Sequence, residues 1–355
     1  MTFDPRFALG ALLLVSFVAW SQAPGGQAGR NRATQAALPF EITRLDPALD
    51  QILAPDTKLD TITTMPGMSG EGPMWREGRL WFSDQRGGNL YTVTLEGKTQ
   101  VIAEQAGGPI NPAWTFSQGP NGQVTDRDGT MLICRQAFRD IGRFKTDGTA
   151  VEFLSRFQGK RFNSPNDLVF GPDGTLWFTD PAYSLPGAMS GGPIPEDSQM
   201  PTEGVYRYRN GELQRAISDM ARPNGIGLSP DGKTLYVTDS TAANIRAYEI
   251  APDGSLSNQR IFTDFGVDAA KRAALPGYPD GLKVDSRGNV WATGPGGVNI
   301  ISPKGQVLGR IQLPFNASNL AFGEPDLGSV FFTTRGTIYR LRSLVPGEKP
   351  LYFRP

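Results

Sequence analysis

The chain contains no histidine and a single cysteine, Cys134, among its 355 residues. Without histidine, a Ser-His-Asp triad, a Cys-His pair and a histidine-ligated zinc site are all excluded. One cysteine cannot form an intramolecular disulfide, and its place in the apolar stretch GTMLICRQ is typical of a small strand residue. Any catalysis must therefore depend on carboxylates, hydroxyls, lysine, arginine or a metal ion held mainly by oxygen atoms.

The chain also lacks a surplus of charge, because 35 Lys and Arg residues balance 35 Asp and Glu residues. It shows no basic stripe of the kind that neutralises a phosphate backbone, so nucleic acid is not expected as a partner. Beyond residue 39 it has no apolar run long enough to cross a bilayer.

The N-terminus predicts export. Arg6 precedes a short apolar run, residues 7–20, and small residues follow, which is the layout of a secretory signal peptide. The run is too short for a comfortable membrane span. We expect residues 1–23 to be a signal peptide cleaved after Ser21 or Ala23, with a periplasmic or extracellular product and no membrane span after processing. An uncleaved N-terminal anchor is the alternative.

Residues 24–39, rich in Gly, Ala, Gln and Arg, read as a flexible linker, and residues 40–355 as the folded domain. The 43 glycines and 29 prolines are spread through the chain rather than gathered in one tail. This distribution suits many short strands joined by many turns.

Six related segments recur along the domain and predict its architecture. They are GEGPMW, PNGQVT, PNDLVF, PNGIGL, PDGLKV and SNLAFG, and the polar residues aligned in them lie 39 to 58 residues apart. A four-stranded propeller blade takes about 40–50 residues. Each segment is followed by a turn and an aromatic strand, such as LWFTD, and then by two further strands. Asp-Gly turns between alternating strands indicate hairpins, so we expect a six-bladed β-propeller of four-stranded antiparallel blades.

Two further features concern the edges of this ring. The stretch KLDTITTM, before the first copy, is a candidate for the missing outer strand of the last blade, which would close the ring. Residues 182–203 form a Gly/Pro-rich insertion that we expect to cover one face as a lid.

One aligned position in each copy carries an oxygen-bearing polar residue. These residues are Glu71, Asn121, Asn166, Asn224, Asp280 and Asn319. The first strand of each propeller blade lines the central channel, so the six side chains are expected to converge there. Two carboxylates with several amide oxygens suit a hard divalent cation, calcium first, with zinc, manganese or magnesium as alternatives. The rival interpretation is that Asn and Asp simply begin turns well, but this explains Glu71 poorly.

Four paired motifs resemble the gluconolactonase, senescence-marker-protein and luciferin-regenerating-enzyme family. They are EGPMW with LWFSD, NSPND with LWFTDP, RPNGIGLSPD with LYVTDS, and PDGLKVD with ATGPGGV. The similarity runs from about Thr64 to Arg342 in the same blade order. It implies a six-bladed propeller, one divalent cation in the central channel and hydrolysis of a small-molecule lactone. Relatives with similar sites include diisopropylfluorophosphatase and, more distantly, paraoxonase.

The resemblance also implies roles for individual residues. Glu71 matches the family's first-blade glutamate ligand, and Asn224 its fourth-blade ligand. Asn166 matches the third-blade asparagine that contacts the metal or its substrate. Asp280 matches the fifth-blade aspartate, a metal ligand that is also proposed as proton donor and acceptor.

Substrate contacts are expected from Asn121, Asn166 and Asn319 in the channel, from Ser164 at its rim and from Tyr183 in the insertion. The chain departs from bacterial gluconolactonases after its second aromatic strand, which those proteins often follow with an acidic residue and a histidine. Arg135 and Gln136 stand there instead, which puts a sugar-lactone substrate in doubt. Arg135 is expected either to neutralise an anionic substrate or to be a surface arginine.

The general base stays open between four aspartates. Asp280 is the first candidate by position, and Asp167, Asp180 and Asp239 are alternatives because they end or flank inner strands. A strand-end aspartate is equally explained by bonds to backbone amides. The leading function is a metal-dependent lactonase, and the alternatives are phosphotriester hydrolysis at the same site or a non-catalytic, calcium-stabilised binding propeller.

Overall fold

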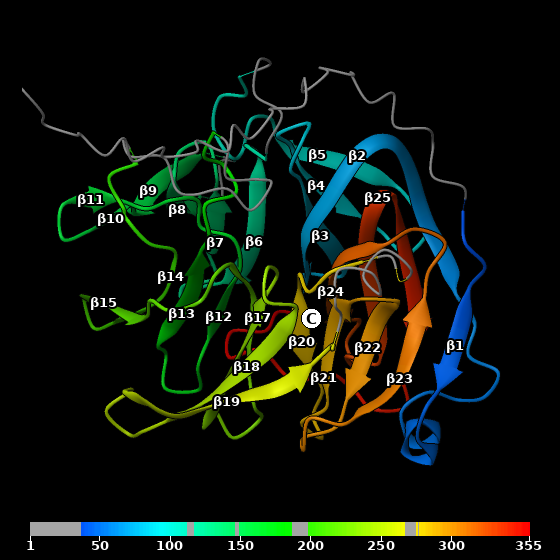
Figure 1. Ribbon diagram of the computed structural model, residues 1–355. Coiled ribbons are helices and arrows are strands. Elements are labelled where there is room, and N and C mark those ends of the chain that lie inside the picture. The colour runs from blue at the N-terminus through cyan, green and yellow to red at the C-terminus, as the bar shows by residue number, and fades with distance from the viewer. Residues whose placement is uncertain (1–36, 112–116, 146–148, 187–197, 267–274, 276) are drawn as a thin grey trace, which may run out of the picture. The chain divides into compact units, whose positions relative to one another are not determined.

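The part of the chain that the structure describes is built mainly from antiparallel strands (Figure 1). The structure is a computed structural model that describes residues 37–111, 117–145, 149–186, 198–266, 275 and 277–355. The expected signal peptide, most of the linker and the middle of the 182–203 insertion lie outside the described residues. None of the described helices has the length and apolar character needed to span a membrane.

Three four-stranded sheets follow the predicted meander, with consecutive strands side by side. The first contains β6 (Pro120–Thr125), β7 (Met131–Arg135), β8 (Asp140–Phe144) and β9 (Ala150–Leu154). The second contains β12 (Leu168–Phe170), β13 (Leu176–Asp180), β14 (Gly204–Arg209) and β15 (Glu212–Ile217). The third contains β16 (Pro223–Leu228), β17 (Thr234–Asp239), β18 (Asn244–Ile250) and β19 (Leu256–Asp264).

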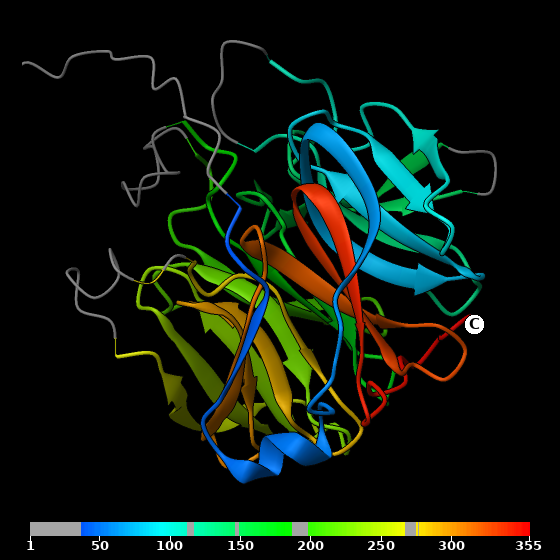
Figure 2. The ribbon, with the colours of Figure 1, turned by 90° about the vertical axis from the view of Figure 1, so that its right-hand side faces the viewer.

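Two larger sheets complete the domain. One contains β20 (Leu282–Val284), β21 (Val290–Gly294), β22 (Gly297–Ile301), β23 (Val307–Gln312) and, on its outer edge, β1 (Glu41–Arg44). The other has the order β24 (Ala317–Gly323), β25 (Ser329–Arg342), β2 (Asp60–Arg76), β3 (Arg79–Asp84), β4 (Leu90–Val93) and β5 (Thr99–Ala103). A small hairpin joins β10 (Arg156–Phe157) to β11 (Lys160–Arg161), and the 3-10 helix η1 (Pro47–Gln51) follows β1. Both β1 and η1 (blue) lie against β23 (Figure 2).

The prediction of a propeller with four-stranded antiparallel blades is confirmed, but the count of six is not, because the described residues form five large sheets. The difference arises at β2, whose 17 residues belong to two pairings. Its first part pairs with β25, as Asp60 with Arg340, and its last part pairs with β3, as Gly70 with Asp84. One long strand therefore fuses two expected blades into one sheet. The pairing with β25 also confirms KLDTITTM as the outer strand beside the last copy.

The apolar core lies between neighbouring sheets. Trp177 and Val205 of one sheet pack with Ile226 and Val237 of the next in a single buried cluster. Further clusters of buried apolar side chains lie elsewhere around the ring within the described residues. Burial of aromatic and branched side chains on both faces of each sheet explains the apolar, aromatic second strand in every copy.

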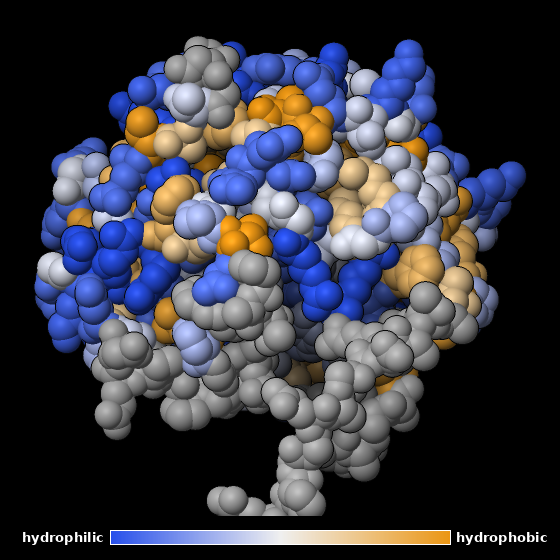
Figure 3. Space-filling view, turned by 90° about the horizontal axis from the view of Figure 1, so that it is seen from above, coloured by the Kyte–Doolittle hydropathy of each residue, from blue (hydrophilic) through white to orange (hydrophobic). Residues whose placement is uncertain are grey.

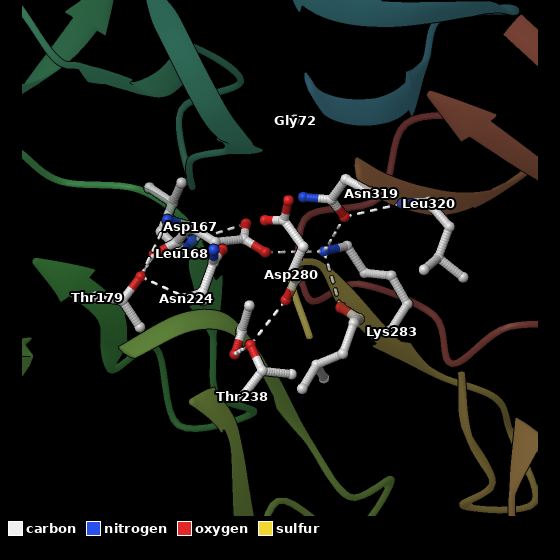
Figure 4. A network of polar contacts seen from close by, with 12 residues as sticks. Gly72, Asp167, Leu168, Thr179, Asn224, Thr238, Asp280, Lys283, Asn319 and Leu320 are labelled. Carbon is white, nitrogen blue, oxygen red and sulfur yellow. Dashed lines mark hydrogen bonds and ion pairs between the residues drawn. The ribbon is translucent and has the colours of Figure 1, made fainter. Parts of the chain in front are cut away.

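The first strands contact one another in a closed cyclic order, β2, β6, β12, β16, β20, β24 and β2 again. Hydroxyls on the aromatic second strands strengthen these junctions by bonding to a carbonyl of the next sheet. The bonds, each 2.7 Å long, join Ser83 to Asn121, Thr179 to Asn224 and Thr238 to Asp280. The last two are drawn in Figure 4. The Ser or Thr of the LWFSD, LWFTD and LYVTD motifs thus fixes the backbone of a predicted site residue.

Close backbone contact at these junctions requires glycine. A Cβ atom on Gly225 would lie 2.3 Å from the Asp280 carbonyl oxygen. One on Gly72, whose φ is +48°, would lie 2.1 Å from the Asn121 carbonyl oxygen. A side chain at either place would push two first strands apart and displace the neighbouring site residue.

The C-terminal tail crosses several sheets. The Ser286 amide donates to the Pro346 carbonyl at 2.9 Å, and the Glu77 amide donates to the Arg354 carbonyl at 3.2 Å. The Tyr352 ring packs edge-on against Phe170, with centroids 5.2 Å apart. These contacts join sheets that are distant in sequence, so the tail ties the ring together.

Candidate functional site

All six residues of the aligned polar position are buried and lie on, or within two residues of, a first strand. They are Glu71 (5% exposed), Asn121 (0%), Asn166 (4%), Asn224 (2%), Asp280 (7%) and Asn319 (1%). Because the first strands form a cyclic set, the six positions occupy equivalent places around one ring. On the face seen in Figure 3, the coloured apolar residues form small patches separated by hydrophilic ones.

The Glu71 carboxylate repels that of Asp280, and the Asp167 carboxylate repels both. Burial is the main cause that raises the pKa of Glu71 from 4.5 to about 7. Burial, and then the Glu71 charge, raises the pKa of Asp280 well above its ordinary value. Two buried, neighbouring carboxylate charges destabilise the folded protein unless a cation or protons neutralise them.

Lys283 is a site residue that sequence reasoning missed. Its Nζ donates to Asp167 Oδ2 at 3.2 Å, to the Leu282 carbonyl at 2.9 Å and to Asn319 Oδ1 at 3.5 Å. These groups come from different first strands and point toward one another (Figure 4). Its place three residues after Asp280 in PDGLKVD is the only sequence signal that could have found it.

The same network defines the surroundings of Asp167 and Asn319. Asp167 is 3% exposed and forms an ion pair with Lys283, so its carboxylate already has a cation. Asn319 Nδ2 donates to Glu71 Oε2 at 3.3 Å, while its Oδ1 accepts from the Leu320 amide at 2.8 Å. Asn319 thus contacts the predicted ligand Glu71 directly.

Asn224, Tyr183 and Ser240 form a second contact group. Asn224 Nδ2 donates to the Tyr183 hydroxyl at 3.0 Å and to Ser240 Oγ at 3.1 Å. Tyr183, expected to contact substrate from the insertion, is therefore in contact with a predicted metal ligand. Tyr278 adds a hydroxyl that hydrogen-bonds with Asp280, although 54% of its surface is exposed. Its position just before Pro279-Asp280 was the available sequence signal.

Ser164 is fully buried, and its hydroxyl donates to the Pro181 carbonyl at 2.6 Å and accepts from the Ser184 amide at 3.1 Å. These bonds tie the segment before β12 to the insertion. A substrate contact by Ser164 would have to compete with them.

The alternative bases Asp180 and Asp239 accept backbone hydrogen bonds. The Asp180 carboxylate receives the Asn163 and Ser164 amides at 2.9 and 2.8 Å, and burial raises its pKa to about 7. Asp239 receives the amides of Ala221 and Ala242, both at 2.9 Å. Both aspartates thus fix the loops that precede a site residue, as the turn interpretation expects.

Arg135 fits neither expectation made for it. It is 5% exposed, and its Nε and Nη2 bond to the two carboxylate oxygens of Asp140 at 2.7 and 2.6 Å. This paired, buried arginine is unavailable to an anionic substrate and is not a surface residue.

We expect Asp140→Asn to lower the free energy of unfolding by about 3 kcal/mol, because it leaves the Arg135 charge buried without a partner. Asp128→Asn removes an exposed partner of Arg143 in the same sheet and is the matched control, with an expected loss below about 1 kcal/mol. Urea unfolding of both variants measures the difference. Equal losses would contradict this account of the buried pair.

Several buried amide groups around the ring have no hydrogen-bond partner among the described residues. They are both polar atoms of Asn121, both of Gln136 and Oδ1 of Asn224. A bound ligand, ion or water is one explanation for unsatisfied polar atoms in a buried place. Gln136 was noted only as a departure from the resembled family, and its burial was not expected.

The donor set fits a hard divalent cation only if amide oxygens take part. Within the described ranges, no three Asp, Glu or Cys side chains are grouped to hold a metal by themselves. Two mutually repelling carboxylates and the unpartnered Asn224 Oδ1 together match the mixed oxygen ligands of calcium or magnesium.

Comparison with known proteins gives consistent matches along the chain. The sequence pattern described as "SMP-30/Gluconolactonase/LRE-like region" matches residues 69–336. A gluconolactonase of Zymomonas mobilis is 31% identical, over 95% of this chain and 97% of its own. A pentonolactonase of Haloferax volcanii is 28% identical, over 75% and 81%. A gluconolactonase structure from Xanthomonas campestris superposes with a TM-score of 0.73 at 30% identity, covering 88% of this chain and 99% of that one.

Proposed function

The chain belongs to the SMP-30/gluconolactonase/LRE-like family, and from this premise we propose that it is an enzyme that hydrolyses a lactone. The observation that carries the proposal is the buried ring of oxygen donors described above, within a chain similar over almost its full length to a gluconolactonase. The pentonolactonase relative supports a lactone as the substrate class.

We propose that one divalent cation, calcium first, binds at Glu71, Asn166, Asn224 and Asp280. Support comes from the repulsion between the two carboxylates and from the unpartnered Asn224 Oδ1. A bound cation would polarise the ester carbonyl and make a bound water more acidic.

Asp280 is the proposed general base. Its carboxylate contacts Asn224 and the Tyr278 hydroxyl, and among the described residues it forms no ion pair of the kind that joins Lys283 to Asp167. It would take the proton from the attacking water and return it to the alkoxide released when the ring ester opens. Asn121, Gln136 and Asn319 would contact the substrate from neighbouring strands, with Tyr183 at the rim.

We also propose that the fused six-stranded sheet acts as two blades, giving six. The separate pairings of the two ends of β2 and the cyclic order of six first strands support this count.

Export remains a proposal supported by Arg6 and the apolar run that follows it. N-terminal sequencing of protein recovered from the periplasm would reveal cleavage after Ser21 or Ala23.

A panel of five- and six-membered lactones with calcium, manganese or zinc tests the function. We expect carboxylic acid release, followed with a pH indicator, at rates well above buffer for at least one lactone. The panel includes phosphotriesters, whose exclusive turnover would move the assignment to that reaction. No turnover of either class by folded, cation-loaded protein would leave the binding-propeller alternative.

A further inference from the structure

The side-chain amide of Asn224 is held in one orientation by a network that reaches from the site into the insertion. Its Nδ2 donates to the Tyr183 hydroxyl and to Ser240 Oγ and also faces the Asp280 carboxylate, whereas its Oδ1 has no partner among the described residues. The residue is 2% exposed, so water does not freely replace these contacts.

The position of one proton fixes this orientation. Ser240 Oγ lies 2.6 Å from the Pro279 carbonyl oxygen, which can only accept, so the serine hydrogen points there. Toward Asn224, Ser240 therefore presents only a lone pair. An amide rotated by 180° would place its carbonyl oxygen against that lone pair, which is repulsive, so Nδ2 must face Ser240.

Tyr183, the second acceptor, is itself braced. The Arg222 guanidinium lies over its ring, 5.1 Å from the centroid. Arg222 forms an ion pair with Glu203 at 3.0 Å, and both side chains are buried, at 5% and 6% exposure. Glu203 ends the 182–203 insertion, so the pair connects this insertion to the site.

We infer that Ser240 and Tyr183 are positioning residues that hold the Asn224 carbonyl oxygen toward the cation site. This inference rests on the proposed cation site and adds to it the residues that orient one ligand. Both hydrogen bonds of Nδ2 form without the cation, so Oδ1 is oriented before a cation binds. This lowers the entropic cost of ordering the Asn224 side chain on binding. Because Pro279 precedes Asp280, the same serine also links the Asn224 side chain to the backbone of a second predicted ligand.

The test measures calcium affinity of the full chain by isothermal titration calorimetry. We expect Ser240→Ala and Tyr183→Phe each to raise the calcium Kd about fivefold to tenfold, and the double variant to raise it further. Ser240→Thr keeps the hydroxyl and is expected to restore near wild-type affinity. Tyr208→Phe, which removes a tyrosine hydroxyl from β14, is the matched control and should leave the Kd unchanged.

Thermal unfolding without calcium separates positioning from loss of structure. The inference predicts weakened calcium binding in variants whose calcium-free melting temperature stays near that of the wild type. If Ser240→Ala and Tyr183→Phe bind calcium with an unchanged Kd while Glu71→Gln abolishes binding, the positioning role is overturned and the cation site stands. Absence of divalent binding by the wild type would instead remove the cation site itself.

Discussion

Asp280→Asn is expected to lower kcat/KM for lactone hydrolysis by about 10³-fold. The substitution keeps the size and the hydrogen-bonding ability of the side chain but removes the group that accepts a proton from water. It also replaces one of two carboxylates proposed to hold the cation. Initial rates are measured at saturating calcium, so that a weakened calcium Kd does not limit the rate. The remaining loss then reports on proton transfer.

Asp239→Asn is the matched control for this prediction. Asp239 is also a buried aspartate, but its oxygens accept backbone amides, so we expect a lower melting temperature and a kcat/KM within about tenfold of wild type. An Asp280→Asn enzyme with near wild-type kcat would exclude Asp280 as the base. Asp167→Asn would then be the next variant, although the Asp167 carboxylate is held in an ion pair with Lys283.

The ring of site positions was predictable from sequence because each repeat carries its own copy of the signal. Glu71, Asn224 and Asp280 align at one place in their repeats, and the structure buries all three on or beside first strands. A pattern that is weak in one repeat becomes informative when it recurs, because equivalent residues occupy the same position in each blade of a propeller and so together surround the axis.

Contacts made between repeats were not predictable in the same way. Lys283 and Ser240 each occur in a single repeat, and their roles depend on groups that come from other sheets, such as Asp167 and Pro279. Arg135 likewise looked available, but Asp140, across the β7–β8 pair, accepts from its Nε and Nη2. A sequence read repeat by repeat carries no signal for such partners.

The number of separate large sheets among the described residues differs from the predicted number of blades for a similar physical reason. The stretch KLDTITTM was expected in the last blade and the first repeat in another, but β2 runs from one to the other through Pro66 and Gly67 as a single strand. Strand continuity depends on pairing with β25 on one side and β3 on the other, and β25 lies some 270 residues away. Local turn chemistry cannot report on so distant a partner.

At pH 8 we expect Glu71→Gln to be more stable than the wild type without calcium and less stable than the wild type with calcium. Without calcium, burial of the Glu71 carboxylate favours its neutral form, with a pKa of about 7 instead of 4.5. The stability that this raised pKa contributes is complete below pH 4.5 and is lost as the pH rises through about 7. At pH 8 the calcium-free wild type therefore carries a cost that the neutral glutamine avoids, and we expect the variant to be more stable by about 2 kcal/mol.

With calcium at about a hundred times its Kd, the order should invert, because binding adds about 2.7 kcal/mol to the wild type. The glutamine lacks the ligand charge and gains much less, and treating the wild type with EDTA should remove both this stabilisation and the activity. Thermal melts at pH 5 and pH 8, with calcium or EDTA, measure all four states, and Glu104→Gln controls for loss of an exposed carboxylate. If calcium stabilises wild type and Glu71→Gln equally, Glu71 is not a ligand. A change in which protein is more stable, wild type or Glu71→Gln, on adding calcium is a stronger test than lost activity. Damage to the fold alone would lower the stability of the variant in every condition.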